Sequence, residues 1–261
     1  MIPKVIHYCW FGHNKKPELV EKCIESWHKF CPDYEIVEWN ESNFDISSAP
    51  LYVQQAYEAK KWAFVTDYVR LWAMTAYGGI YMDTDVELVR SPDLILNHEA
   101  VSGFESQSQI QTGLMACREG FPLFEELLHY YDDAVFRNSD GTLNMTTNVD
   151  IITEMCLKHG FVPNGKYQVV DGFVLYPRDV FCPIDYQTGK KNITENTISI
   201  HWFSATWVDE SAKEYKRRLD KLARFVGRHN ADVILGIISC IKKEGITSYV
   251  VKRVKKHIKH E

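Results

Sequence analysis

The sequence predicts an α/β fold with a mostly parallel central sheet for most of this 261-residue chain. Short β-branched and aromatic runs alternate with segments of helical spacing, which is typical of strand–helix–strand units. The chain is also long enough to bury a core without disulfides or a structural metal. Its composition, 45% hydrophobic and 25% charged, is that of an ordinary globular protein. Disordered, collagen-like and coiled-coil classes are therefore excluded.

The alternation begins at the N-terminus. Lys4–Trp10 is a β-branched and aromatic run, and Pro17–Phe30 has apolar residues at helical spacing. Tyr34–Trp39 predicts the next strand, Lys60–Tyr77 a long helix, and Ile80–Met82 the strand that follows. In open sheets of this kind the ligand crevice lies outside the carboxyl ends of the strands. We therefore expect the functional residues where these strands end.

The second half of the chain predicts further elements of the same domain. The expected elements are strands at Ala100–Phe104 and Gly113–Cys117, helices at Phe121–Phe136 and Val149–His159, and loops with short strands at Phe161–Ile200. The sequence shows no internal repeat and no low-complexity linker. This favours one catalytic domain over residues 1–210 and a basic, amphipathic helical tail over residues 211–261.

Charge separates the tail from the rest of the chain. Residues 211–261 carry 14 Lys and Arg against 5 Asp and Glu, a balance of +9, whereas residues 1–210 carry −14. Basic helices of this kind either lie on an anionic membrane surface or pack on the domain with a solvated face, and both interpretations stay open. The apolar run at Val233–Ile241 is too short for a bilayer, which needs about 20 residues. Nucleic acid is not an expected partner, because a basic face alone reads no bases.

Cysteine usage and the first residues indicate the compartment. The seven cysteines contain no Cys-x-x-Cys pair, so neither a disulfide framework nor a zinc ribbon is predicted. Met1–Ile6 begins no apolar signal segment. We expect a reducing, cytoplasmic location, with peripheral attachment to the inner face of the plasma membrane left open by the tail.

Two charged residues interrupt the predicted helix Lys60–Tyr77. Asp67 and Arg70 are three positions apart and share a face of a helix that is otherwise apolar nearly all round. Buried charge is costly unless it is paired or liganded. The two side chains therefore form an internal ion pair or face a polar cleft.

A pair of carboxylates follows the next strand. Asp83 and Asp85 stand two apart after a diglycine turn and an apolar run, a pattern that suits a hard divalent ion with positions left for phosphate oxygens. Such an ion stabilises the charge of a departing diphosphate. A phosphatase-type nucleophile is a weaker alternative, because Glu87 stands where that signature has Thr or Val. The Gly-rich phosphate loop of nucleoside triphosphatases is absent.

An aromatic segment near the end of the domain carries a histidine. His201 alone is best interpreted as a buried structural residue. If it returns to the Asp-x-Asp pair, it adds a nitrogen ligand compatible with Mn²⁺. Trp207 offers a flat apolar face to a sugar or a base.

Four ordered blocks together resemble the family 32 glycosyltransferases, sugar-nucleotide enzymes of bacterial capsule and lipopolysaccharide loci and of yeast mannosyl transfer. The blocks are Ile6–Gly12, Ala63–Arg70, Gly78–Asp85 and His201–Trp207. The sequence is more distantly similar to the catalytic domain of clostridial glucosylating toxins. The resemblance spans roughly residues 1 to 210 and implies the GT-A fold, a nucleotide-diphosphate sugar donor, Mn²⁺ or Mg²⁺, and transfer with retention of configuration.

The resemblance also implies roles for single residues. On the donor side it implies base stacking by Trp10, donor-sugar contacts by Asp67 and Arg70, a phosphate or ribose contact by Tyr81, ribose and metal binding by Asp83, metal binding by Asp85 and His201, and a diphosphate contact by Trp207. Asp83, Asp85, Arg70 and Asp67 are the expected catalytic group. Asn148 and Asp150 are expected on the acceptor side. Many members read His-His-x-x-Gly-Ser-Trp where this chain reads His201–Trp207, so the second His and the Gly are missing.

The expected function is therefore metal-dependent, retaining hexosyl transfer from a nucleotide sugar. The expected acceptor is a saccharide or lipid-linked saccharide in capsule, O-antigen or exopolysaccharide synthesis. Two alternatives stay open: an effector that glycosylates a protein, and a non-catalytic carbohydrate- or nucleotide-binding protein. The second is disfavoured because both metal-type carboxylates are present.

Overall fold

The computed structural model describes residues 1–186 and 188–204, together with residues 218, 219, 222, 227, 233–236 and 238. The chain divides into two compact units, Met1–Ser204 and Ala205–Glu261. The elements described below belong to the first unit. Most of the predicted tail lies outside the described residues, so its helices and the boundary at residue 210 stay predictions. Of the helices within the described residues, none has the length and apolarity needed to cross a membrane.

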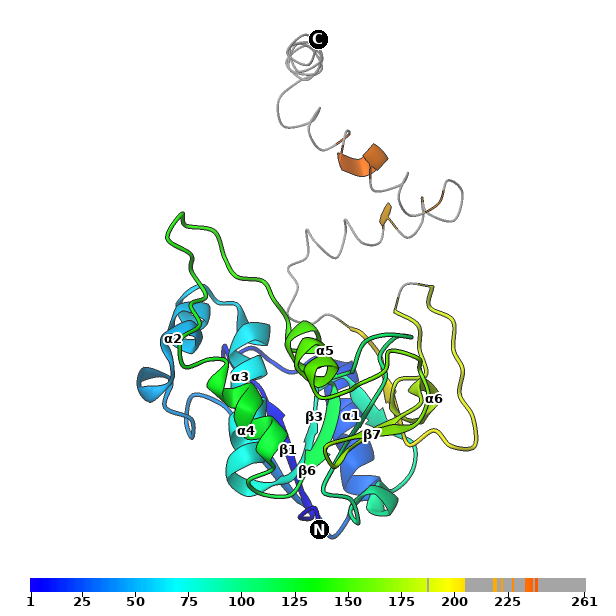
Figure 1. Ribbon diagram of the computed structural model, residues 1–261. Coiled ribbons are helices and arrows are strands. Elements are labelled where there is room, and N and C mark those ends of the chain that lie inside the picture. Colours follow the sequence, from blue (N-terminus) through cyan, green and yellow to red (C-terminus); the bar gives the residue numbers. More distant parts are fainter. Residues whose placement is uncertain are drawn as a thin grey trace. The chain divides into compact units, whose positions relative to one another are not determined.

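A seven-stranded sheet forms the centre of the first unit, in the order β2-β1-β3-β6-β5-β8-β7 (Figure 1). Its strands are β1 (Val5–Cys9), β2 (Glu35–Trp39), β3 (Gly79–Met82), β5 (Ala100–Gly103), β6 (Leu114–Cys117), β7 (Gln168–Val170) and β8 (Phe173–Tyr176). The pairs β1–β2, β1–β3 and β5–β8 are parallel, whereas β6 runs antiparallel to β3 and β5, and β7 to β8. Five of these strands thus point the same way, which confirms the predicted α/β fold with a mostly parallel sheet.

Helices cover both faces of this sheet. They are α1 (Glu18–Phe30), α2 (Leu51–Glu58), α3 (Trp62–Tyr77), α4 (Pro122–His129), α5 (Asn148–Lys158) and α6 (Arg178–Phe181), with short 3-10 turns at Ile46–Ser48 and Asp93–Ile95. Because successive side chains of a strand point to opposite faces, Tyr81 joins a core cluster with α2 to α5, while Ile80 and Met82 join a second cluster with α1. Burying side chains of this size contributes roughly 1.5–3 kcal/mol each.

A two-stranded sheet links the end of the domain to the Asp-x-Asp segment. Strand β4 (Val86–Leu88) pairs antiparallel with β9 (Ser199–His201), and Val86 lies opposite His201. The pairing brings residues more than 110 positions apart in the sequence to the same edge of the domain. This tertiary pairing positions the candidate site.

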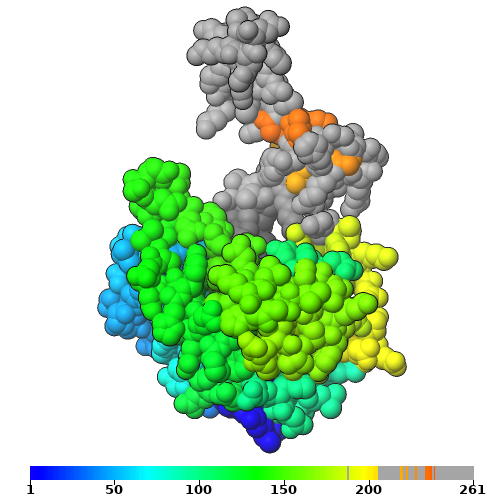
Figure 2. Space-filling model, in the orientation of Figure 1, coloured from blue at the N-terminus to red at the C-terminus, as the bar shows by residue number. Residues whose placement is uncertain are grey.

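Several elements differ from the prediction, among them the helices α4 and α2. The expected helix Phe121–Phe136 ends at His129, and a loop follows whose tip forms a bridge between Arg137 and Leu143. The side chain of Gln55 accepts hydrogen bonds from two backbone N–H groups of that loop, at residues 136 and 137, at 3.0 and 2.9 Å. This loop stands out from the surface between α4 and α5 (Figure 2). Helix α2, which supplies Gln55, was not predicted.

Candidate functional site

The Asp-x-Asp pair lies where β3 ends and turns into β4. The backbone N–H of Asp83 donates to the carbonyl of Gly113 at 2.8 Å, which extends the β3–β6 pairing by one residue. The N–H of Val86 then donates to the carbonyl of Asp83 at 2.9 Å and closes the turn. The two carboxylates therefore stand at the carboxyl end of a buried strand, as the sequence predicts.

Asp83, Asp85 and His201 form a cluster that can hold a metal ion. Each offers one ligand atom, and these atoms all lie within 4.8 Å of one another. Nε2 of His201 is 3.3 Å from Oδ1 of Asp85, and its buried Nδ1 has no hydrogen-bond partner among the described residues. Two carboxylates and an imidazole are a donor set suited to a divalent ion such as Mn²⁺. The residues present thus fit the implied metal.

Asp85 is held by the segment that follows β9. Its Oδ2 accepts hydrogen bonds from the backbone N–H and the hydroxyl of Ser204, at 2.7 and 2.8 Å. Phe203 has a φ of 51°, in the left-handed region, and its ring stacks on His201 with centroids 4.1 Å apart. Burial by itself would raise the pKa of Asp85, but His201 and Ser204 outweigh it and hold this pKa well below its usual range. The carboxylate therefore stays ionised.

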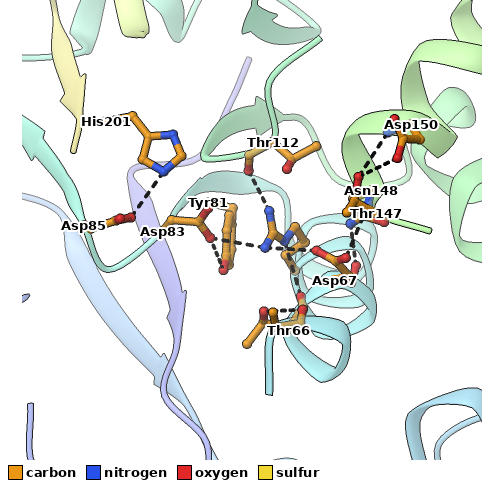
Figure 3. A network of polar contacts seen from close by, with 12 residues as sticks. Thr66, Asp67, Tyr81, Asp83, Asp85, Thr112, Thr147, Asn148, Asp150 and His201 are labelled. Carbon is orange, nitrogen blue, oxygen red and sulfur yellow. Dashed lines mark hydrogen bonds and ion pairs between the residues drawn. The ribbon is translucent and has the colours of Figure 1, made fainter. Parts of the chain in front are cut away.

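Arg70 connects helix α3 to the Asp-x-Asp pair. Its side chain is 5% exposed, and Nη2 lies 3.1 Å from Oδ1 of Asp67 and 3.2 Å from Oδ1 of Asp83. In Figure 3 the dashed lines that start at Asp67 and at Asp83 meet between these two carboxylates. Nη1 donates to the carbonyl of Thr112 at 2.9 Å. The internal ion pair predicted as one alternative is thus present, and it reaches the carboxylate pair.

Tyr81 also binds the carboxylate of Asp83. Its hydroxyl donates to Oδ1 of Asp83 at 3.0 Å, and the guanidinium carbon of Arg70 lies 4.7 Å from its ring centroid. Oδ1 of Asp83 is thereby occupied by Tyr81 and Arg70. The other oxygen, Oδ2, lies 3.4 Å from the position that a Cβ built on Gly113 would take, and two atoms of the His201 ring lie 2.9 Å from that position. The free oxygen of Asp83 thus lies near His201, where it can serve as a metal ligand.

Gly113 leaves the space that His201 occupies. A Cβ built on Gly113 would lie 2.9 Å from both Cε1 and Nδ1 of His201 and 3.4 Å from Oδ2 of Asp83. Real Cβ atoms essentially never approach other atoms within 3.0 Å, so no larger residue fits without moving the imidazole. Gly113 lies at the start of a predicted strand, but nothing in its sequence context indicated contact with His201.

A second polar link joins α3 to α5. The backbone N–H of Asn148 donates to Oδ2 of Asp67 at 3.3 Å, and its amide donates to the carbonyl of Asp67 at 2.7 Å. The fully buried Tyr131 donates its hydroxyl to Oδ1 of Asn148 at 2.7 Å. Burial raises the pKa of Asp67, against the attraction of Arg70. Asn148 is 2% exposed and orders Asp67, and its predicted acceptor contact stays a prediction.

Two of the remaining predicted residues, Asp150 and Trp10, are among the residues that the structure describes. Asp150, in the first turn of α5, is half-buried and accepts hydrogen bonds from Gln109 and Thr147. Trp10 follows β1, half-buried, with its indole N–H donating to the carbonyl of Asn14 at 2.7 Å. Base stacking by Trp10 stays a prediction. Trp207 lies outside the described residues.

Sequence reasoning missed four residues of the site. They are Tyr131, Gly113, Ser204 and Glu105, the last a half-buried carboxylate beyond β5 whose electrostatic neighbours are His201, Asp83 and Asp150. The rule that ligands bind at carboxyl ends of strands could have found Glu105, because it directly follows the expected strand Ala100–Phe104. The others needed the tertiary structure.

Residues 17–102, which include Asp83 and Asp85, are similar to a known family. They match the family model described as "Glycosyltransferase sugar-binding region containing DXD motif". Asp83 and Asp85 supply the DXD pattern within this region. The predicted resemblance to Asp-x-Asp glycosyltransferases is thus confirmed over residues 17–102, which are similar to the sugar-binding region of such enzymes.

Comparison with individual proteins agrees with this class. Inositol phosphoceramide mannosyltransferase 3 of Schizosaccharomyces pombe is 32% identical over 135 residues, covering 49% of this chain. The match covers 36% of that relative, so the chain corresponds to little more than a third of its length.

Solved glycosyltransferase structures are also similar to the chain. PaToxG glycosyltransferase has a TM-score of 0.49 at 18% identity, covering 60% of this chain and 69% of that one. The galactosyltransferase LgtC, in complex with donor and acceptor sugar analogs, has a TM-score of 0.40 at 12% identity, covering 77% and 87%.

Proposed function

We propose that this protein is a divalent-cation-dependent glycosyltransferase that moves a hexosyl group from a nucleotide-diphosphate sugar to a saccharide acceptor. The observation that supports it best is the cluster of Asp83, Asp85 and His201, with both aspartates in the region that matches the glycosyltransferase model. Beside it lies the Arg70 network, which consists of Arg70 and its ion pairs with Asp67 and Asp83. Tyr81 and Arg70 bind one oxygen of Asp83, and Ser204 binds one oxygen of Asp85. The other oxygen of each carboxylate can bind a cation.

The residues of this site have two tasks, to hold the cation and to fix the carboxylates in place. Asp83, Asp85 and His201 would hold the cation, which we propose to be Mn²⁺ and which, when bound, supplies positive charge to the leaving diphosphate. Arg70 forms ion pairs with the carboxylates of Asp67 and Asp83 and holds them beside a buried positive charge. Such preorganised charge does not have to reorganise when the bond breaks, which is the main source of electrostatic catalysis.

The donor subsite follows from the same framework. We assign Trp10 to the nucleotide base, Tyr81 to a phosphate or ribose, and Trp207, by its sequence alone, to the diphosphate. Transfer with retention is assigned by family analogy. Neither carboxylate of the pair is assigned as a nucleophile, because Asp83 is engaged by Arg70 and Tyr81, and Asp85 by Ser204 and His201.

The acceptor is proposed to be a saccharide of a surface polysaccharide, free or lipid-linked. The name of the S. pombe relative joins a mannosyl group to a phosphoceramide, which supports a lipid-linked acceptor and adds mannose to the donor sugars to be tested. A lipid-linked acceptor would place the protein at the inner face of the plasma membrane, with the basic tail on the anionic surface.

The test is turnover of the purified protein with Mn²⁺ and a panel of UDP- and GDP-sugars, GDP-mannose among them. We expect release of nucleoside diphosphate with one donor, loss of that release in EDTA, and recovery when Mn²⁺ is restored. Nucleotide binding without release would instead indicate a non-catalytic binding protein. Neither binding nor release with any donor would refute the proposal.

A further inference from the structure

A tight loop beyond β5 places a carboxylate at the edge of the metal cluster. The backbone N–H of Glu105 donates to the carbonyl of Gln109 at 2.8 Å, and Phe104 forms a β-bridge with Ile110. The loop is also fastened to α5, because the Gln109 amide donates to Oδ1 of Asp150 at 3.2 Å. Glu105 is therefore held on a short, braced loop between the sheet and α5.

The carboxylate of Glu105 is not part of a structural ion pair. It is half-buried, and neither a hydrogen bond nor an ion pair of its side chain is present within residues 1–186 and 188–204. Burial raises the pKa of its carboxyl; His201 opposes this, and Asp83 and Asp150 add to it. A carboxylate withdrawn from water without a protein partner is costly. Such a group is expected where a ligand supplies the missing donors.

The charges around Glu105 restrict which ligand this can be. Glu105, Asp83 and Asp150 would together repel a phosphate unless a cation lay between them, so direct binding of a phosphate by Glu105 is unfavourable. An ionised carboxylate only accepts hydrogen bonds, up to about four, and hydroxyl groups are the donors that a saccharide offers. The chemistry of the site thus points to sugar hydroxyls.

The position of Glu105 favours the acceptor over the donor as its ligand. Asp67, which lies on the α3 side, is locked to Arg70 and Asn148. Glu105 lies instead on a loop whose tip, Gln107 and Ser108, is exposed to solvent. A saccharide acceptor that extends into solvent can reach Glu105 over this tip.

We propose that Glu105 is an acceptor-binding residue, whose carboxylate accepts hydrogen bonds from hydroxyl groups of the acceptor saccharide beside the metal cluster. This inference rests on the proposed function. It assigns to Glu105 the positioning of the acceptor hydroxyls and leaves the nucleotide and the cation to Asp83, Asp85, His201 and the Arg70 network.

The experiment compares Glu105→Gln with a matched control, Glu154→Gln, on the exposed face of α5. The amide keeps the size of the side chain but loses its charge and one acceptor oxygen. UDP and GDP binding with Mn²⁺ is measured by calorimetry, and transfer is measured against the concentration of methyl mannoside, methyl glucoside and methyl galactoside. We expect Glu105→Gln to keep nucleotide affinity within about twofold and to raise the acceptor KM by about tenfold or more, since a hydrogen bond to a charged group is lost.

Deoxy analogues of the accepted glycoside make the test specific. The wild type should lose affinity for the analogue that lacks the bound hydroxyl, and Glu105→Gln should show little further loss with it. An unchanged acceptor KM, or a defect confined to nucleotide and Mn²⁺ binding, would overturn the inference while transfer by the wild type upheld the proposed function. A wild type that hydrolyses a donor but transfers to no saccharide would overturn the saccharide acceptor and this inference together. If Glu105→Gln fails to fold, Glu105→Asp, which withdraws the carboxylate by one methylene, carries the same comparison.

Discussion

Gly113 has no side chain and so leaves room for the His201 ring in the cluster of Asp83, Asp85 and His201. It is not among the glycines with a positive φ, so alanine is compatible with its backbone. The Cβ of Gly113→Ala would lie 2.9 Å from two atoms of the His201 ring. Ordinary contact between carbon atoms begins at about 3.5 Å, so the imidazole must move by roughly 0.6 Å.

The magnitude follows from the tolerance of metal coordination. Ligand distances in metal sites hold to within about 0.2 Å, so a shift of this size takes His201 out of coordination range or distorts the site. Disturbing the groups that orient metal ligands typically costs about 10–100-fold in affinity. We therefore expect Gly113→Ala to weaken Mn²⁺ binding by that factor, or about 1.4–2.8 kcal/mol.

The assay is Mn²⁺ titration by calorimetry, with EPR of free Mn²⁺ as a check. Gly236→Ala is the matched control, because a Cβ there would meet no atom within 4 Å. His201→Ala and the double variant complete a cycle. If the effect is steric, Gly113→Ala should cost little once the imidazole is absent.

Two results would refute this reasoning. Wild-type Mn²⁺ affinity in Gly113→Ala would show that His201 is not confined by this contact. An equal loss from Gly113→Ala in the presence and absence of the imidazole would show that the effect does not pass through His201.

Three further predictions rest on other contacts. Asp85→Asn should abolish transfer and Mn²⁺-dependent donor binding while the thermal unfolding temperature stays near that of the wild type; near-normal turnover with Mn²⁺ would contradict the metal assignment. Tyr131→Phe should lower the free energy of unfolding by about 1–3 kcal/mol, because the buried amide oxygen of Asn148 loses its donor; denaturant unfolding measures this, and a loss below about 0.5 kcal/mol would count against it. His159 has a raised pKa, chiefly through its hydrogen bond to Asp171, with Glu126 adding to it. Its contribution to stability is complete below the ordinary pKa of 6.5 and is lost as pH rises through the raised value, so His159→Gln should be less stable than the wild type at low pH and equal to it at high pH; a difference independent of pH would exclude this explanation.

Local patterns predicted most of the sheet and the first half of the site. The run Ile80–Met82 is apolar because β3 is buried on both faces, and the two carboxylates directly after it must lie at its end. Likewise, Asp67 and Arg70 share a face by helical spacing alone. Such features depend on neighbours in the sequence, and so they can be predicted without the rest of the fold.

Contacts between distant segments required the structure. His201 was an isolated histidine in the sequence, and only the register of β9 on β4 brings it to Asp85. The loop after α4 is held by Gln55 of α2, and the partners of Asn148 depend on how α5 packs against α3.

The sequence by itself thus determined most strands of the central sheet, the long helix with Asp67 and Arg70, and the paired carboxylates, because periodicity and adjacency are local properties. The tertiary structure decided the position of His201 beside these carboxylates, the space at Gly113 and the surroundings of Glu105. Each of these depends on which segments pack together, and strand register and helix packing are set by burial of the whole core.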